Sequence, residues 1–145
     1  KTVRLGGNDI GGEGVRRVAR ALTRGCQALT HLDLQCNWVN AEGALQLARA
    51  LPFCRTLAML DLSSNLVGDA GAKSIAGVLP EVKALTSLNL ERNNIASEGA
   101  RHLAGGVTRA KGLSHLKLDG NNIGAEGAGW LALLPPHVHV AFALF

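Results

Sequence analysis

The sequence contains few aromatic residues and few cysteines. It has two Trp, three Phe and no Tyr, so a nucleic-acid platform built on stacked aromatic side chains is disfavoured. Its three cysteines are an odd number and include no Cys-x-x-Cys spacing, so neither a disulfide framework nor a zinc ribbon is expected. This cysteine usage suits a reducing compartment, and we therefore expect a cytoplasmic location.

Long apolar runs are also missing. No uninterrupted apolar stretch is long enough to cross a bilayer, and the first four residues carry no hydrophobic signal region. We therefore expect no membrane insertion. The net charge of +4 permits an acidic partner without requiring one. With 145 residues, 47% of them hydrophobic, the chain is long enough to form one domain around its own core.

An internal repeat organises the chain. An Asn and a Gly six residues after it recur in one register, at spacings of 29, 28, 28 and 28: Asn8, Asn37, Asn65, Asn93 and Asn121, with Gly14, Gly43, Gly71, Gly99 and Gly127. The complete units all read LxxLxLxxN and look like one repeat type. They divide a single domain, 1–145, into units 1–28 (truncated), 29–56, 57–84, 85–112 and 113–145, the last with a terminal cap.

Each unit predicts a strand followed by a helix. Apolar and polar residues alternate in segments such as Leu32-Asp33-Leu34, which indicates a strand with one buried face. Apolar residues at helical spacing follow the Gly. Parallel strands lie about 4.8 Å apart, whereas packed helices need about 8–10 Å. The stack must therefore curve, giving an α/β solenoid or horseshoe segment with strands on the concave face and helices on the convex face.

The pattern LxxLxLxxN, followed by Ile or Val, then Gly, Ala and Leu-Ala at fixed offsets, resembles the leucine-rich repeat of the ribonuclease-inhibitor type. That repeat occurs also in NACHT-domain immune receptors and in Ran GTPase-activating protein. The resemblance covers residues 3–134 and implies a binding scaffold that is not an enzyme and has no cofactor. Because the first unit lacks its leading Leu and a capping helix, we also expect a larger parent chain.

The outward strand positions of the concave face are the candidate partner-binding residues. Packing does not restrict them, and they differ from unit to unit: His31, Asp33, Gln35, Met59, Asp61, Ser63, Asn89, Glu91, His115, Lys117 and Asp119. Mixed charge of this kind suits local complementarity to another protein. The sequence does not indicate an oligomeric state.

A second candidate lies at the rim, where each strand turns into its helix. Trp38 and Leu66 directly follow the repeated Asn in adjacent units, and with Cys36 and Met59 they predict an exposed apolar patch. Exposed Trp is a frequent interface anchor. The alternative is that Trp38 packs on the neighbouring turn, and the sequence leaves both open.

Several positions carry structural predictions. The repeated Asn is expected to satisfy turn amides of its own and of the neighbouring unit. Cys26 and Cys54 share an apolar column and are expected to be small buried hydrophobes.

At the C-terminal end, Pro135 should end the last helix near Leu134. Residues 137–145 predict a last, irregular strand, over which Trp130 can fold with Phe142 or Phe145, unless Trp130 stays exposed.

Catalytic interpretations find little support. His31 with Asp33, and His115 with Asp119, are the best acid–base pairs, but each lies on an open surface with no nucleophile. The two histidines are three units apart, roughly 14 Å by strand spacing, too far to share a metal. The basic residues of the helices are scattered and are expected to form a solvated convex face.

Two proteins that contain this type of repeat suggest alternative functions for the chain. Ran GTPase-activating protein acts through an arginine on a strand-to-helix loop, and only Arg92 has such a place here, without any loop insertion. A GTPase-activating regulator is therefore the alternative function. Ribonuclease inhibitor presents an acidic surface and alternates Cys-rich repeats, whereas this chain has a pI near 9.4 and few cysteines, so nuclease inhibition is disfavoured.

Overall fold

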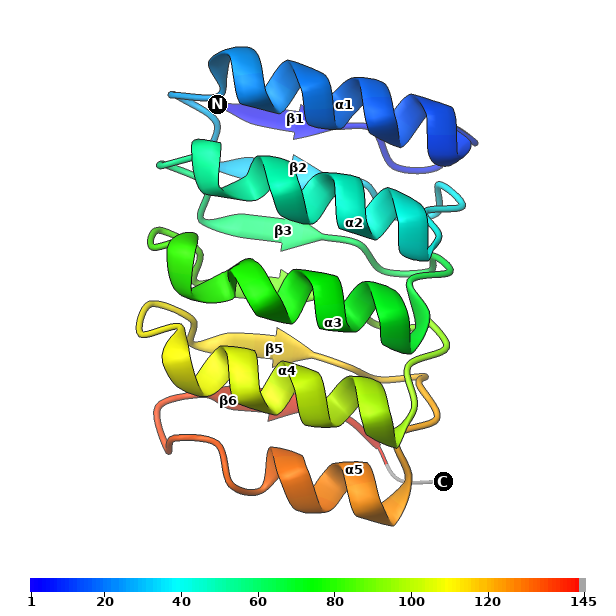
Figure 1. Cartoon of the computed structure of the whole chain (residues 1–145), viewed down its shortest axis with the longest axis vertical. Coiled ribbons are helices and arrows are strands. Elements are labelled where there is room, and N and C mark those ends of the chain that lie inside the picture. Colours follow the sequence, from blue (N-terminus) through cyan, green and yellow to red (C-terminus); the bar gives the residue numbers. More distant parts are fainter. Residues whose placement is uncertain (144–145) are drawn as a thin grey trace.

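The computed structural model describes residues 1–143 as strands alternating with helices (Figure 1). The strands are β1 (Thr2–Arg4), β2 (His31–Asp33), β3 (Met59–Asp61), β4 (Ser87–Asn89), β5 (His115–Lys117) and β6 (His139–Ala141). The helices are α1 (Gly11–Gly25), α2 (Ala41–Ala50), α3 (Gly68–Val78), α4 (Ser97–Arg109) and α5 (Gly124–Leu131). Two short 3-10 helices, η1 (Leu51–Phe53) and η2 (Leu79–Glu81), follow α2 and α3. None of the helices described is long and apolar enough to cross a membrane.

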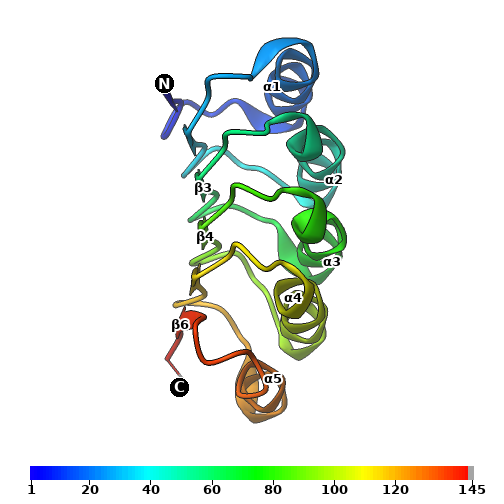
Figure 2. The same cartoon turned by 90° about the vertical axis from the view of Figure 1, so that its left-hand side faces the viewer.

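The strands form one parallel sheet in chain order, β1 to β6. Equivalent residues of successive units are paired, for example Leu32 with Leu60 and Leu60 with Leu88. The helices form a second layer on one face of this sheet and bow outward, so that the strand layer is concave (Figure 2). The predicted α/β leucine-rich-repeat solenoid is therefore confirmed.

The core lies between the two layers. The two leucines of each LxL segment are buried, as are the helical leucines and alanines that face the sheet; Leu34, Leu47, Leu62 and Leu90 are fully buried. One continuous apolar cluster runs from Val15 to Val138. Because every unit contributes to it, the backbone positions of the concave face are set by packing behind the sheet.

The repeated Asn forms the expected hydrogen-bond ladder. Asn65 is 5% exposed, and its Oδ1 accepts from the amides of Asn37 and Val39 at 3.0 and 2.9 Å. Its Nδ2 donates to the carbonyls of Leu34 and Leu62 at 3.0 and 2.9 Å. Equivalent bonds join the other ladder residues. Buried turn amides and carbonyls are thereby satisfied, which is what a buried turn requires.

The helix starts show two alternating turn types, although the sequence pattern predicts one repeat type. In units one, three and five the helix begins on a Gly with a positive φ, namely Gly11 (55°), Gly68 (60°) and Gly124 (65°). In units two and four an extended residue precedes the helix, Asn40 with φ −92° and Ala96 with φ −107°. The difference follows from the residue available, since Gly adopts the left-handed conformation without the steric cost of a Cβ.

The two extended starts are capped differently. Asn40 Oδ1 accepts from Gly43 N at 2.9 Å and caps its own helix. Ala96 has no such side chain, and Asp69 of the preceding unit replaces it: Asp69 Oδ1 accepts from Ala96 N at 2.7 Å and from Gly99 N at 3.0 Å. The start of α4 therefore depends on a residue from another repeat.

The C-terminal end differs in detail from the prediction. Helix α5 ends at Leu131, three residues before the predicted stop, and the chain continues in tight turns in which Leu134 N donates to Leu131 O. The last strand is regular where it pairs with β5, His139 lying opposite His115. Phe142 packs against the core, while Trp130 is 38% exposed. The predicted contact with Phe145, and the end of the predicted strand at 145, lie outside the described residues.

Two cysteines are paired, which corrects the prediction that no disulfide forms. Cys26 and Cys54 are buried, as expected for their apolar column, at 4% and 1% exposure. Their Cα atoms are 5.2 Å apart and a disulfide joins them. The reason is the repeat itself, which places equivalent residues of adjacent units side by side although they are 28 residues apart in sequence. Cys36 is exposed and free.

Candidate functional site

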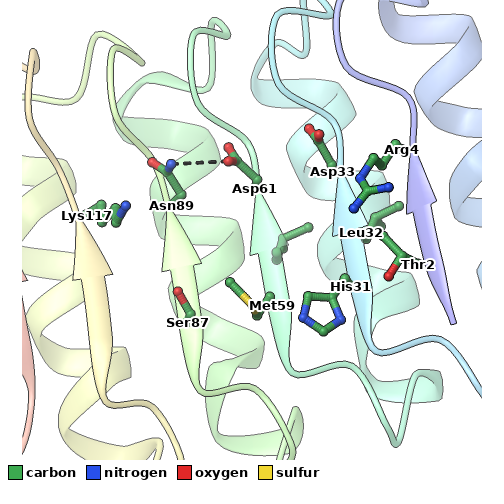
Figure 3. A pocket seen from close by; sticks show the side chains of 11 residues that line it. Thr2, Arg4, His31, Leu32, Asp33, Met59, Asp61, Ser87, Asn89 and Lys117 are labelled. Atoms are coloured by element: carbon green, nitrogen blue, oxygen red, sulfur yellow. Dashed lines mark hydrogen bonds between the residues drawn. The ribbon is translucent and has the colours of Figure 1, made fainter.

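The concave face carries a shallow hollow of about 340 Å³ across strands β1 to β5 (Figure 3). Its lining includes six of the predicted site residues, which the parallel register brings together: His31, Asp33, Met59, Asp61, Asn89 and Lys117. Thr2, Arg4 and Ser87 occupy the same strand columns and also line it. The predicted site residues do not include these three. Their positions in the strand columns of the repeat are the signal by which the sequence could identify them.

The middle row of this hollow has an ordered charge pattern. Register places Arg4, Asp33, Asp61, Asn89 and Lys117 side by side on successive strands. Two carboxylates therefore occupy the centre, with a cation toward each end. Side chains at equivalent positions of neighbouring strands lie about 5 Å apart, so a partner's side chains can contact several members of the row together.

The two central carboxylates are held by local donors. Asp33 accepts from the Gln35 amide at 3.0 Å and from Gln35 Nε2 at 3.3 Å. Asp61 accepts from Ser63 Oγ at 2.7 Å, and Asn89 Nδ2 lies 3.3 Å from its other oxygen (Figure 3). Within residues 1–143 neither carboxylate forms a salt bridge. Both are half-buried, fixed in direction, and keep acceptor capacity for a partner's donors.

The third row of predicted residues differs more from expectation. Gln35 is exposed, and Glu91 and Asp119 are half-buried. Ser63 is buried, at 8% exposure, because its hydroxyl turns to Asp61. Ser63 therefore offers little surface to a partner, and its hydroxyl orients Asp61.

The histidines are not oriented by the acids paired with them in the sequence. His31 Nδ1 lies 2.8 Å from Thr30 Oγ1, and His115 Nδ1 lies 2.9 Å from Ser114 Oγ. The ring of His115 also faces that of His139, with the ring centres 5.3 Å apart. A general base needs an orienting partner and a nearby reacting group, and neither His–Asp combination supplies this arrangement.

The rim patch forms as predicted, with one exception. Trp38 and Leu66 are 61% and 44% exposed, and with Cys36 they line a second hollow of about 270 Å³. Met59 is 44% exposed but belongs to the concave hollow, so its predicted place in the rim patch is wrong. The strand direction explains this, because Met59 begins β3 whereas the rim follows the strand ends.

Trp38 combines exposure with an uncommon backbone conformation. Its φ is +60°, a left-handed conformation that costs an L-residue roughly 1–2 kcal/mol and is unusual for a bulky one. Asp9 and Asn94, at the equivalent position of other units, have φ values of 50° and 57°, but Asn and Asp adopt this conformation more readily. Trp38 Nε1 donates to Asp9 Oδ1 at 2.9 Å. Trp38 thus touches the neighbouring turn through its polar edge while most of the side chain stays in solvent.

Arg92 lies on the strand-to-helix turn of the fourth unit, as the sequence predicts. It is exposed and has a φ of +52°. The residue before the ladder Asn has a positive φ in every unit: Gly7, Cys36, Ser64, Arg92 and Gly120. The conformation of Arg92 is therefore a property of the repeat. Its side chain passes over Gly120, where an added Cβ would collide with Arg92 Cγ.

Two groups of the helix layer have shifted pKa values. On α4, the Arg101 guanidinium donates to both oxygens of Glu98. This hydrogen bonding lowers the pKa of the Glu98 carboxyl and raises the pKa of Arg101. Both groups are exposed and stabilise the first turn of α4 rather than the concave site.

The repeat architecture defines a leucine-rich solenoid whose concave surface varies from unit to unit. The leucine-rich repeat family model matches residues 1–19, 25–48, 53–76, 84–104 and 113–132. The chain therefore belongs to the leucine-rich repeat family.

Comparisons with individual proteins support the fold. The chain is similar to the solved structure of leiomodin-1 actin-binding site 2, with a TM-score of 0.75, 22% identity and coverage of 90% of this chain and 74% of that one. An internalin from Listeria monocytogenes aligns with a TM-score of 0.40 and 18% identity over 81% of this chain and 42% of that one, below the level that indicates a shared fold. No curated protein sequence matches the chain.

Proposed function

We propose that this domain binds another protein through its concave hollow and the adjoining Trp38 rim, without catalysis. The observation that carries the proposal is Trp38, which is 61% exposed with a φ of +60°. Strained residues tend to gather at functional sites. Trp38 adds little to the buried core, and its positive φ carries a steric cost. Contact with a partner therefore explains this residue better than packing does.

The charge pattern suggests how the partner is recognised. Asp33 and Asp61 can accept hydrogen bonds from basic side chains at the centre of the hollow, and Arg4 and Lys117 can pair with acidic side chains nearer its ends. Trp38 and Leu66 supply the apolar anchor at the rim. Because the sheet is held by the core and the Asn ladder, the surface is presented in a fixed shape, which reduces the entropy lost on binding.

The solved neighbour is consistent with a protein partner. The leiomodin-1 structure is described as an actin-binding site, so a solenoid of this shape binds protein in at least that case. An identity of 22% supports the shared fold and does not transfer actin to this chain. The partner is therefore proposed as a class, a protein with a mixed-charge surface.

The narrower assignments are also proposals. The 28-residue period and one helix per unit support the ribonuclease-inhibitor type of repeat. That type in turn suggests a larger receptor or scaffold, such as a NACHT-domain protein. A cytoplasmic location stays a prediction, and the thiol state of Cys26 and Cys54 in cells tests it.

The proposal is tested by capturing partners on the immobilised domain. Asp33→Lys/Asp61→Lys should lose partners that the unchanged domain retains. The matched control is Glu42→Lys/Glu126→Lys, which makes the same change of net charge on exposed helix residues. Circular dichroism melts establish that each variant is folded. Equal retention by the two variants would reject the concave face as the binding surface.

Arg92 supports a second candidate function, a GTPase-activating regulator. Its side chain is exposed on the strand-to-helix turn and forms no salt bridge within the described residues. Adding the domain to GTP-loaded small GTPases measures this directly. Faster GTP hydrolysis that disappears with Arg92→Ala would favour this function over a passive scaffold, and an unchanged rate would remove it.

A further inference from the structure

A column of basic residues follows the edge where each helix returns to the next strand. The return segments contain tight turns in which the amide of residue four donates to the carbonyl of residue one: Leu57 to Cys54, Leu85 to Val82 and Leu113 to Ala110. The first central residue of these three turns is Arg55, Lys83 or Lys111. Because the turns are stacked by the repeat, the three cations occupy equivalent corners of successive units. We call Arg55, Lys83 and Lys111 the return-edge column.

Two members of this column border a groove between the third and fourth units. The groove has a volume of about 410 Å³. Lys83, Arg109 and Lys111 supply its charges, and no carboxylate lines it. The buried residues Leu79, Val82 and Ala110 form its apolar base. This return-edge groove therefore combines three cations with an apolar base.

The cations of the groove are not neutralised within the described chain. Lys83, Arg109 and Lys111 are exposed, and none takes part in a salt bridge among residues 1–143. Arg109 is partly fixed, because its Nε donates to Gly105 O at 3.2 Å. Its two terminal nitrogens are left for an external acceptor. Glu81 is the one acidic residue of the return segments and does not line the groove.

Backbone donors add to the side-chain cations. The amides of Lys83 and Ala84, and of Lys111 and Gly112, occupy the centres of their turns and donate to no acceptor in the described part of the chain. Gly112 passes so close to Lys83 O that a Cβ there would collide with it. The two turns are therefore packed directly against each other, which places both sets of amides beside the cations.

The acidic residues of the helices lie at the opposite edge of the solenoid, where basic residues pair with Glu13 and Glu98. Acidic residues occupy the first turn of every helix, at the edge where strands lead into helices: Glu13, Glu42, Asp69, Glu98 and Glu126. The return segments line the left-hand edge in Figure 1 and face the viewer in Figure 2. The acids are a helix length away, so they only weakly reduce the positive potential of the return edge at physiological salt.

We infer that the return-edge groove binds an extended acidic segment of a protein partner, at a site separate from the concave face. Successive turns are separated by a distance between the strand spacing, about 4.8 Å, and the helix spacing, about 8–10 Å. Alternate residues of an extended peptide are about 6.5–7 Å apart. Acidic residues at alternate positions therefore match successive cations, while intervening apolar side chains can contact the base of the groove.

A protein segment fits the groove better than a nucleic acid. Binding of single-stranded nucleic acid combines cations with aromatic side chains on which bases stack. No aromatic residue lines the return-edge groove. Its apolar base has no role toward a phosphate backbone but matches the side chains of a peptide.

The test measures fluorescence anisotropy of a labelled peptide of alternating Glu and Leu/Ser residues. The unchanged domain should bind it with an affinity that falls steeply as salt is raised. Lys83→Glu/Lys111→Glu should weaken binding at least about tenfold, because two attractive contacts become repulsive. Glu81→Gln should leave binding unchanged or strengthen it. Trp38→Ala should have no effect, which separates this site from the concave one.

The matched control is Lys73→Glu/Arg20→Glu, which changes the net charge equally at exposed positions on α3 and α1 outside the groove. It should keep the affinity within about twofold. Equal loss in the control would show a nonspecific charge effect and overturn the site. Absence of peptide binding at physiological salt, or tighter binding of an oligouridine or of inorganic phosphate than of the peptide, would also overturn it. Thermal melts establish that both double variants are folded.

Discussion

Trp38 Nε1 donates a hydrogen bond to Asp9 Oδ1 at 2.9 Å, joining the strand-to-helix turns of the first two repeats. This contact satisfies the polar edge of the indole and leaves 61% of the residue exposed. A Trp side chain usually contributes both to packing in the fold and to partner recognition. Here the contribution to packing is small, because most of the residue is in solvent. Replacing Trp38 should therefore affect partner binding far more than folding.

Trp38→Asn should lose partner binding while the free energy of unfolding stays the same or rises by up to about 1 kcal/mol, because Asn adopts a positive φ more easily. Trp38→Ala should also weaken binding with a nearly unchanged thermal midpoint. Parallel binding and melting curves measure both. The control is Trp130→Asn, at the other exposed Trp, which should leave binding intact. A large loss of stability in Trp38→Asn would show that Trp38 is a core residue.

Asn65→Ala should destabilise the domain by about 3 kcal/mol or more, since each buried group left without a partner costs about 1–3 kcal/mol. The change removes the acceptor for the Asn37 and Val39 amides and the donor to Leu34 and Leu62. Denaturant unfolding measures the effect. Asn122→Ala, at an exposed residue of the fifth unit's turn, should change stability by no more than about 0.5 kcal/mol. Similar values for the two variants would contradict a structural ladder.

Asp69→Ala should cost about 1–2 kcal/mol, because the first turn of α4 loses its side-chain cap. Hydrogen exchange should accelerate at Ala96 and Gly99 before it does elsewhere in the domain. Glu126→Ala removes an exposed acid from the first turn of α5 and makes a suitable control. Asp69→Asn, which keeps an acceptor oxygen, should recover most of the loss. If Asp69→Ala resembled Glu126→Ala, the cap between repeats would have no energetic importance.

Reducing the Cys26–Cys54 disulfide should lower stability by up to about 3–4 kcal/mol, the chain-entropy value for a loop of this length. Cys54→Ala should lose this stabilisation in oxidising buffer and show no further change on adding reductant. Denaturant unfolding with and without dithiothreitol measures it. Thiol labelling after rapid acid quenching of cells then tests the location: three reactive cysteines after unfolding agree with a cytoplasmic protein, and one, Cys36, contradicts it.

The period of the sequence is enough to predict the architecture, because every unit buries apolar residues at the same positions of the repeat. Leu32, Leu60 and Leu88 fall in one column and lie side by side in the sheet. The Asn ladder followed in the same way. Cys26 and Cys54 share a column in the aligned units, so the repeat makes these residues, 28 apart, immediate neighbours. The odd number of cysteines argues against a full disulfide framework but does not exclude one pair beside a free Cys36.

The candidate site was predicted less completely, because its contacts depend on side-chain direction within and between units. Ser63 occupies an outward position, yet its hydroxyl turns to Asp61 and leaves the surface. Asp69 lies one residue before the acidic column of the other helices, so its role as a cap for the next repeat was not visible. The basic column of Arg55, Lys83 and Lys111 is visible in the aligned units, but its groove requires the packing of Gly112 against Lys83.

The central claim, recognition of a protein partner by the concave face, is tested most directly by site-specific photo-crosslinking. A photoreactive amino acid replaces Met59 in the concave hollow or Lys73 on the convex face of α3, both exposed, and each domain is irradiated in an extract of the source cells. The account predicts a defined protein adduct from position 59 that is absent from position 73 and lost when Trp38→Ala is added. Adducts from position 73 with none from position 59 would contradict it.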